Sequence, residues 1–422
     1  GFRIGWCKIN GVMKKLILWA GCMAGLLLAA CSSAEDRKSG SLETIPVADA
    51  FGNLQPLKVS DFLGRIRYVA LETNDSVLVG EGAHIGLLPG YILVTDEKQA
   101  LLFDKNDGHF VCKLGHYGND PSGYASSKVW FQGHDGAVCF RGWKDEWLRY
   151  DLQGQFQGML KMSENAACAS VSLLASEEGY IQYFNNGLVD GKEGLVWYTS
   201  EPRQEGDTLL LAQGKPVNMS DIKSIGVFKS TPCHFTQKGM FYIVSNQDQS
   251  NVVLTNPPVL WQEGEQIRFM RYRNDTVYTV DKYRLTPAYW FDMGNLSVTK
   301  MKEEDASKAL VLGKVDELEK SIFFECFDAL VEEDHLYYGV YNRRKGTVVM
   351  GRRTDKIMDD LTPFMPVDFS ERTNAHELAG MIEAADVLEW VEEHESCKDN
   401  PELGFLKTLK EDDNPVVVIA RE

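Results

Sequence analysis

The feature that most constrains the fold is a unit of four short apolar or alternating runs that occurs twice in tandem. The runs cover 85–88, 91–95, 100–104 and 109–114 in the first unit, and 129–132, 137–141, 147–151 and 156–161 in the second. Turn residues separate them, among them Asp107-Gly108, where both residues tolerate a positive φ. Short runs punctuated in this way are typical of antiparallel strands. Four-stranded meanders in tandem predict the blades of a β-propeller.

The rest of the chain keeps the strand pattern with a less regular period. Strands are predicted over 169–175, 180–184, 196–199, 208–212, 241–245, 267–272, 276–281, 322–331, 336–341 and 347–352. Helical insertions are expected at about 301–320, which is rich in charged residues, and at about 375–410, where apolar residues such as Leu378 and Ile382 recur at helical spacing. We therefore predict an all-β propeller domain over 57–422 with two helical insertions.

A last apolar run, 416–420, follows the second predicted helical insertion. A ring of blades leaves unpaired strand edges unless one end of the chain completes the blade that the other end began. We therefore predict that 416–420 is a strand that closes the ring.

Residues 1–31 have the composition of an upstream extension and a lipoprotein signal peptide. A basic pair precedes an uncharged apolar run over 16–30, which is short for a membrane span. Small residues lead to Ala30 and Cys31, as in the bacterial lipobox, and the sequence then turns polar at once. We expect cleavage between Ala30 and Cys31 and acylation of the Cys31 thiol; the alternatives are a buried helix or an uncleaved anchor.

An acylated Cys31 would hold the protein on a lipid bilayer, because each buried methylene contributes about 0.8 kcal/mol. Residues 32–56 would then form a tether and N-terminal segment. The sequence thus predicts an outer-membrane lipoprotein, and it leaves open whether the protein faces the periplasm or the cell surface.

The charge of the chain excludes one class of partner. The formal net charge is −17, and removing the four basic residues of 1–31 leaves 40 basic against 61 acidic residues, or −21. A surface this acidic repels phosphate backbones, and no cluster of Lys and Arg compensates locally. We therefore expect no nucleic-acid partner.

Several segments, in order along the chain, resemble the six-bladed β-propeller lipoproteins of Bacteroidetes, whose repeats are similar to NHL and TolB-like propellers. They are 67–73, 91–108, 113–124, 273–287 and 412–419. The resemblance covers most of the chain after Cys31 and implies six blades. Ser122-Gly123 stands where the family has Gly-Glu, so a role of that glutamate does not carry over. The resemblance implies no established activity.

The motifs of metal and cofactor sites are absent or incomplete in the sequence. His376-Glu377 lacks the second histidine that a zinc-protease helix needs. A calcium loop beginning at Asp104 would require a carboxylate at position 115, which is Gly115. The six cysteines after Cys31 are scattered singly and are expected to be buried apolar residues. We therefore predict no metal, no cofactor and no catalytic residue that the sequence alone can name.

Three ionisable residues are candidates for a site at the mouth of a central channel. His84 and His234 begin or precede predicted inner strands, and Glu325 interrupts an apolar run. Each has an ordinary structural explanation, which for Glu325 is a strand with one outward acid.

Two tryptophans offer a binding hypothesis. Trp143 and Trp147 lie in or beside a polar hairpin that also contains Arg141, and flat rings with polar neighbours suit stacking on sugar rings or partner side chains. The alternative is that Trp147 packs between blades.

These observations favour a membrane-anchored binding or scaffold module for a glycan, a peptide or an envelope protein. The alternative is an extracytoplasmic hydrolase or lyase that acts on a polymer at the channel mouth, and a purely structural role in the envelope is a third hypothesis.

Overall fold

The computed structural model describes residues 42–144, 146–161, 172–176, 179–185, 192–199, 207–213, 222–234, 238–246, 251–255, 260–271, 274–301, 308–328, 335–369 and 376–422. The chain divides into two compact units, Gly1–Ser41 and Leu42–Glu422. All described residues belong to the second unit, so the predicted cleavage site at Ala30 and Cys31 lies outside them. No helix within the described residues is long and apolar enough to cross a membrane.

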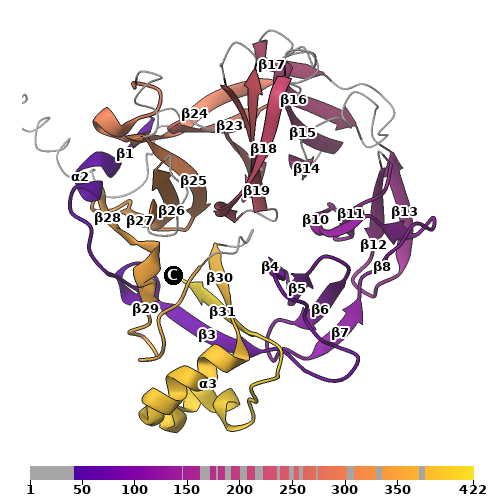
Figure 1. Ribbon diagram of the computed structural model, residues 1–422, viewed down its shortest axis with the longest axis vertical. Helices are drawn as coiled ribbons and strands as arrows, with labels where there is room; N and C mark the ends of the chain where they lie inside the picture. Colours follow the sequence, from indigo (N-terminus) through magenta and orange to yellow (C-terminus); the bar gives the residue numbers. More distant parts are fainter. Residues whose placement is uncertain are drawn as a thin grey trace, which may run out of the picture. The chain divides into compact units, whose positions relative to one another are not determined.

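The second unit is a β-propeller of six blades, as the sequence predicted (Figure 1). The first two blades consist of the eight strands predicted from the tandem repeat, with small differences at their ends. The strands are β4 (His84–Leu88), β5 (Tyr91–Thr95), β6 (Ala100–Asp104) and β7 (Phe110–Lys113) in blade 1; β10 (Ser126–Gln132), β11 (Val138–Arg141), β12 (Glu146–Tyr150) and β13 (Phe156–Lys161) in blade 2; β14 (Ser172–Ser176), β15 (Gly179–Asn185), β16 (Lys192–Thr199) and β17 (Thr208–Gln213) in blade 3; β21 (Leu260–Glu263), β22 (Gln266–Met270), β23 (Thr276–Asp281) and β24 (Arg284–Asp292) in blade 4; β25 (Leu310–Glu317), β26 (Ser321–Asp328), β27 (Leu336–Asn342) and β28 (Thr347–Arg352) in blade 5; and β30 (Glu377–Ile382), β31 (Val416–Arg421) and β3 (Arg65–Ala70) in blade 6.

Apolar side chains pack between neighbouring blades. One cluster joins Val417 of blade 6 to Ile85 of blade 1, and another joins Leu102 of blade 1 to Phe140 of blade 2. A strand that is covered on both faces can carry apolar residues continuously, which explains the unbroken apolar runs of strands such as β5.

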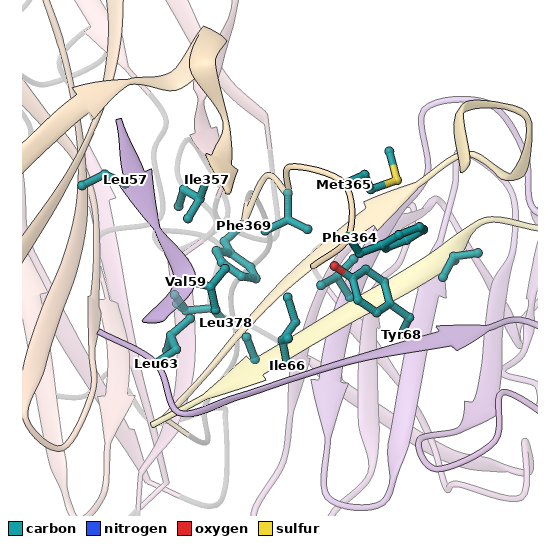
Figure 2. Close-up of a cluster of buried hydrophobic side chains, with 14 of the residues drawn as sticks. Leu57, Val59, Leu63, Ile66, Tyr68, Ile357, Phe364, Met365, Phe369 and Leu378 are labelled. Atoms are coloured by element: carbon teal, nitrogen blue, oxygen red, sulfur yellow. The ribbon is translucent and has the colours of Figure 1, made fainter. Parts of the chain in front are cut away.

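The two ends of the propeller close blade 6, which confirms the predicted closing strand. β31 pairs antiparallel with β30 on one side and with β3 on the other, so that Tyr68 lies opposite Val418. Figure 1 shows β30 and β31 in yellow beside β3 in violet. Tyr68 also packs edge-on against Phe364 (Figure 2), and its hydroxyl donates to Asp359 Oδ2 at 2.7 Å. The ring is therefore closed by pairing and by side-chain packing together.

The segment expected to be a tether is partly built into the propeller. β1 (Glu43–Pro46) pairs in parallel with β24 and gives blade 4 a fifth strand, and α2 (Val47–Phe51) follows it. β2 (Leu57–Lys58) pairs in parallel with β29 (Ile357–Met358). Of the expected tether over 32–56, residues 42–56 therefore belong to the same compact unit as the propeller.

One further three-stranded sheet of the described residues is not one of the six blades. It consists of β18 (Ile222–His234), β19 (Lys238–Asn246) and β20 (Asn251–Thr255). β14 of blade 3 contacts β21 of blade 4, while β18 contacts β25 and β26 of blade 5. Blades 3 and 4 are thus neighbours in the ring, and this sheet is an addition to it.

The helix predicted over 301–320 is wrong for its second half. Residues 310–317 form β25, in which every residue is buried. Lys314, Asp316 and Glu317 make the sequence look like a solvated helix, but ionic partners within the fold neutralise them. Residues 302–307 lie outside the described residues.

The helical insertion predicted over 375–410 begins too early. Leu378 and Ile382 belong to β30. Residues four apart lie on one face of a strand as well as of a helix, so their spacing does not distinguish the two structures. The α-helix is α3 (Ala384–Glu393). Further helical turns of the described residues are η7 (Glu395–Asp399) and η8 (Pro401–Lys407) near the C-terminus, and η1 (Val59–Asp61), η3 (Gly294–Leu296) and η6 (Arg353–Asp355) elsewhere.

Candidate functional site

The two tryptophans singled out in the sequence lie in different environments. Trp147 on β12 is only 5 % exposed and packs edge-on against Phe131, with the ring centroids 5.0 Å apart. Phe131 in turn contacts Tyr180 of blade 3. Trp147 is therefore part of the packing between blades 2 and 3, while Trp143 in the loop between β11 and β12 is 50 % exposed.

Trp143 lies beside a second exposed aromatic residue, Tyr117. The two ring centroids are 5.7 Å apart at an interplanar angle of 60°, and Tyr117 is 42 % exposed. The indole Nε1–H donates a hydrogen bond to the carbonyl oxygen of Gly118 at 2.5 Å, which fixes the ring. The indole is thus held in place beside the exposed ring of Tyr117.

Strand direction explains why two loops far apart in the sequence meet. The connection from blade 1 leads into the first residue of β10, at one end of the blade. Because β10, β11 and β12 are antiparallel, the hairpin between β11 and β12 lies at that same end of the blade. Tyr117 lies in the first connection and Trp143 in the second. No pattern in the sequence indicates Tyr117, because its pairing with Trp143 depends on the geometry of the blade.

The connection that carries Tyr117 is anchored at both ends. Leu114 and Tyr124 are fully buried, and β8 (His116–Tyr117) pairs with β9 (Gly123–Tyr124). The Tyr150 hydroxyl donates to the carbonyl oxygen of Ser122. These anchors restrict the conformations in which the connection presents its middle residues to solvent.

A carboxylate lies next to the aromatic pair. The Asp120 Oδ2 atom is 2.5 Å from His116 Nε2, and Oδ1 accepts hydrogen bonds from the Ser122 backbone N–H at 3.0 Å and hydroxyl at 2.9 Å. These hydrogen bonds, first of all the one from His116, lower the pKa of Asp120 to about 2. Asp120 is therefore an ionised acceptor at neutral pH. We call Tyr117, Trp143, His116, Asp120 and Ser122 the aromatic loop site.

Arg141, the third residue of the binding hypothesis, is half-buried at the end of β11. Its carbonyl oxygen accepts a hydrogen bond from the Ala125 N–H at 2.9 Å. This bond ties the strand that leads to Trp143 to the end of the connection that carries Tyr117.

Glu325 lies within blade 5 and is 3 % exposed. Two cations approach its carboxylate, Lys314 Nζ at 4.0 Å and Arg353 Nη1 at 3.9 Å. Lys314 also pairs with Asp316 at 2.8 Å, and Arg353 pairs with Asp368 at 2.9 Å. We call these five residues the Glu325 cluster. It is a buried ionic cluster within the blade, and Glu325 is therefore not the outward acid that the structural explanation expected.

Burial raises the pKa of Glu325 from 4.5 to about 7, although Lys314 and Arg353 oppose the shift. Desolvation disfavours the charged form, and ion pairs near 4 Å are too long to compensate fully. Glu325 therefore holds or releases a proton near neutral pH.

The two histidines of the channel hypothesis lie on other sheets. His84 is the first residue of β4, is 7 % exposed and lies opposite Thr95 of β5. His234 is the last residue of β18, and its side chain lies outside the described part of the chain. His84, His234 and Glu325 thus belong to three different sheets. In the described ranges, no three His, Cys, Asp or Glu side chains gather in a metal-binding arrangement.

The fold is similar to that of a solved structure of low sequence identity. A crystal structure of a protein from Bacteroides fragilis, designated as exported, matches 90 % of this chain and 99 % of its own with a TM-score of 0.54 and 15 % identity. A Bacteroides caccae protein of unknown function covers 67 % of this chain and 91 % of its own at 11 % identity, with a TM-score of only 0.29. No curated protein sequence matches the chain.

A family model does match the sequence itself. The model of a domain of unknown function, DUF4934, covers residues 42–421, which is the whole propeller from β1 to β31. The protein therefore belongs to the DUF4934 family.

Proposed function

We propose that this protein is an exported, membrane-tethered propeller that acts as a binding module through the aromatic loop site. The observation that carries the proposal is the exposed pair of Tyr117 and Trp143, whose indole is fixed by the carbonyl oxygen of Gly118. Aromatic side chains supply a large contact area at little cost in conformational entropy, and a fixed ring has already met part of that cost. Functional residues are often found on loops held by a rigid scaffold.

The expected lipobox at Ala30 and Cys31 supports a location outside the cytoplasm, as does the similarity in fold to the Bacteroides fragilis protein designated as exported. We propose an outer-membrane lipoprotein anchored through acylated Cys31.

The surroundings of Glu325 favour a binding function over a hydrolase or lyase that cleaves a polymer. Its pKa near 7 suits a general acid or base, but the carboxylate is buried and faces Lys314 and Arg353. A polymeric substrate would have to displace this ionic core to reach it.

The test of the proposed function is a binding panel with the full chain in detergent. The panel contains oligosaccharides and peptides on one array, and positive signals are measured again by calorimetry. We expect at least one class to bind and the double variant Tyr117→Ala/Trp143→Ala to lose roughly tenfold or more in affinity, with unchanged circular dichroism.

The matched control is Tyr283→Ala, which removes an equally exposed aromatic side chain from the hairpin between β23 and β24 of blade 4. This variant should bind as the unaltered protein does. An absence of binding to both classes, or binding that the double variant retains, would refute the proposed function.

A further inference from the structure

The hydrogen-bonding state of Trp143 restricts what can occupy the aromatic loop site. The only hydrogen-bond donor of an indole is its N–H. In Trp143 this donor is already used on the carbonyl oxygen of Gly118. A ligand that stacks on the ring therefore meets no free hydrogen-bond donor there. The exposed face of the ring suits C–H groups, and it also accepts a cation.

Asp120 restricts the ligand from the other side. The Oδ1 atom accepts two hydrogen bonds from Ser122, and Oδ2 contacts His116, which leaves acceptor capacity on Oδ2. The side chain of Asp120 is half-exposed, so this capacity faces solvent. Because an ionised carboxylate cannot donate, the ligand must bring a hydrogen-bond donor.

Gly118 lies close to both the indole of Trp143 and the carboxylate of Asp120. Its carbonyl oxygen accepts from Trp143, and a Cβ atom built on Gly118 would lie 2.9 Å from Asp120 Oδ2. The carboxylate oxygen thus lies beside the residue whose carbonyl oxygen holds the indole. One small ring with an apolar face and donors on its rim can reach both.

Charge selects among such ligands. Asp120 is ionised, and the chain as a whole carries a net charge of −17. An anionic ligand would be repelled both by the site and by the surface around it.

Building on the proposed function, we propose that the occupant of the aromatic loop site is a neutral carbohydrate. One sugar ring stacks its C–H face on Trp143, and a hydroxyl of that ring donates to Asp120. Tyr117 extends the apolar surface toward the next sugar, so a short oligosaccharide should bind better than a single ring.

The experiment is calorimetry of the full chain with neutral gluco-, manno- and xylo-oligosaccharides, an anionic oligogalacturonate, and aromatic and basic peptides. We expect binding of at least one neutral series, no binding of the oligogalacturonate and little change on adding salt. Asp120→Asn, which keeps the shape but weakens acceptance and adds a donor, should reduce affinity roughly tenfold. Trp143→Ala should reduce it at least as much, and Tyr283→Ala should leave it unchanged.

The outcomes separate this inference from the proposed function. Peptide binding that depends on Trp143, without sugar binding, would overturn the carbohydrate assignment and leave the binding module intact. If no ligand of the panel binds, both the carbohydrate assignment and the proposed binding function are refuted. Sugar binding that Asp120→Asn leaves within twofold would overturn the assigned hydroxyl contact.

Discussion

At the scale of single residues, the raised pKa of Glu325 gives a direct test of the buried ionic cluster. Burial raises its pKa from 4.5 to about 7, so the folded state holds a proton that the unfolded state releases between these two values. The corresponding stability is fully present below the unfolded pKa and is lost as the pH rises through about 7.

We therefore predict that Glu325→Gln reduces the pH dependence of unfolding. Between about pH 5 and about pH 8 the free energy of unfolding should fall by roughly 1–3 kcal/mol less in the variant than in the unaltered protein. Urea unfolding at the two pH values measures this. Glu319→Gln, which changes an exposed acid in the neighbouring turn, is the control, and an equal pH slope in all three proteins would contradict the prediction.

Gly115 tests how tightly the aromatic loop site is held. Its φ is +64°, and a Cβ atom would lie 2.5 Å from Cζ of Tyr150, the residue that binds the Ser122 carbonyl oxygen. Gly115→Ala should destabilise the protein by about 1–3 kcal/mol and weaken ligand binding, because the loop must shift.

Gly90→Ala is the matched control for this substitution. Gly90 has a similar φ of +79°, but nothing lies within 4 Å of its Cβ position. It should cost only the backbone term, about 1 kcal/mol, and leave ligand binding unchanged. Equal effects of the two substitutions on binding would show that the contact with Tyr150 does not matter. Thermal unfolding and calorimetry supply both readouts.

At the scale of elements, β31 holds blade 6 together, because it pairs with both β30 and β3. We predict that deletion of residues 415–422 lowers the melting temperature sharply, since the N-terminal and C-terminal parts of the blade lose their shared strand. Val418→Asp is a milder version that buries a charge in the same strand and should cost several kcal/mol. Unchanged melting of both variants would count against closure by β31.

β25 is the element that the sequence wrongly predicted to be helical, and its partners explain why. Arg268 of blade 4 holds Glu317 through Nε at 2.7 Å, while Lys314 pairs with Asp316. Charged residues in a strand look solvent-facing when the strand is considered alone. Their burial is acceptable because each charge has an opposite partner, which for Glu317 comes from blade 4 and for Lys314 and Asp316 lies within β25 itself.

At the scale of the whole molecule, the proposed anchor makes a direct prediction. Cys31→Ser should move the protein from the membrane to the soluble fraction, because no acyl chain can then be attached. Cys112→Ser changes a free cysteine of the propeller and should leave the protein on the membrane. Fractionation of cells followed by immunoblotting distinguishes the two, and membrane retention of Cys31→Ser would contradict lipid anchoring.

The sequence by itself determined the strand repeat of blades 1 and 2 and the closing strand, because alternation of apolar residues and turn chemistry are local properties of the chain. It also pointed to Trp143. Only the tertiary structure decided that β25 is a buried strand and that β1 adds a strand to blade 4. It also decided that Trp147 packs between blades 2 and 3 and that Tyr117 lies beside Trp143. Each of these depends on which residues meet across blades, and no local period encodes the identity of a partner that is distant in the chain.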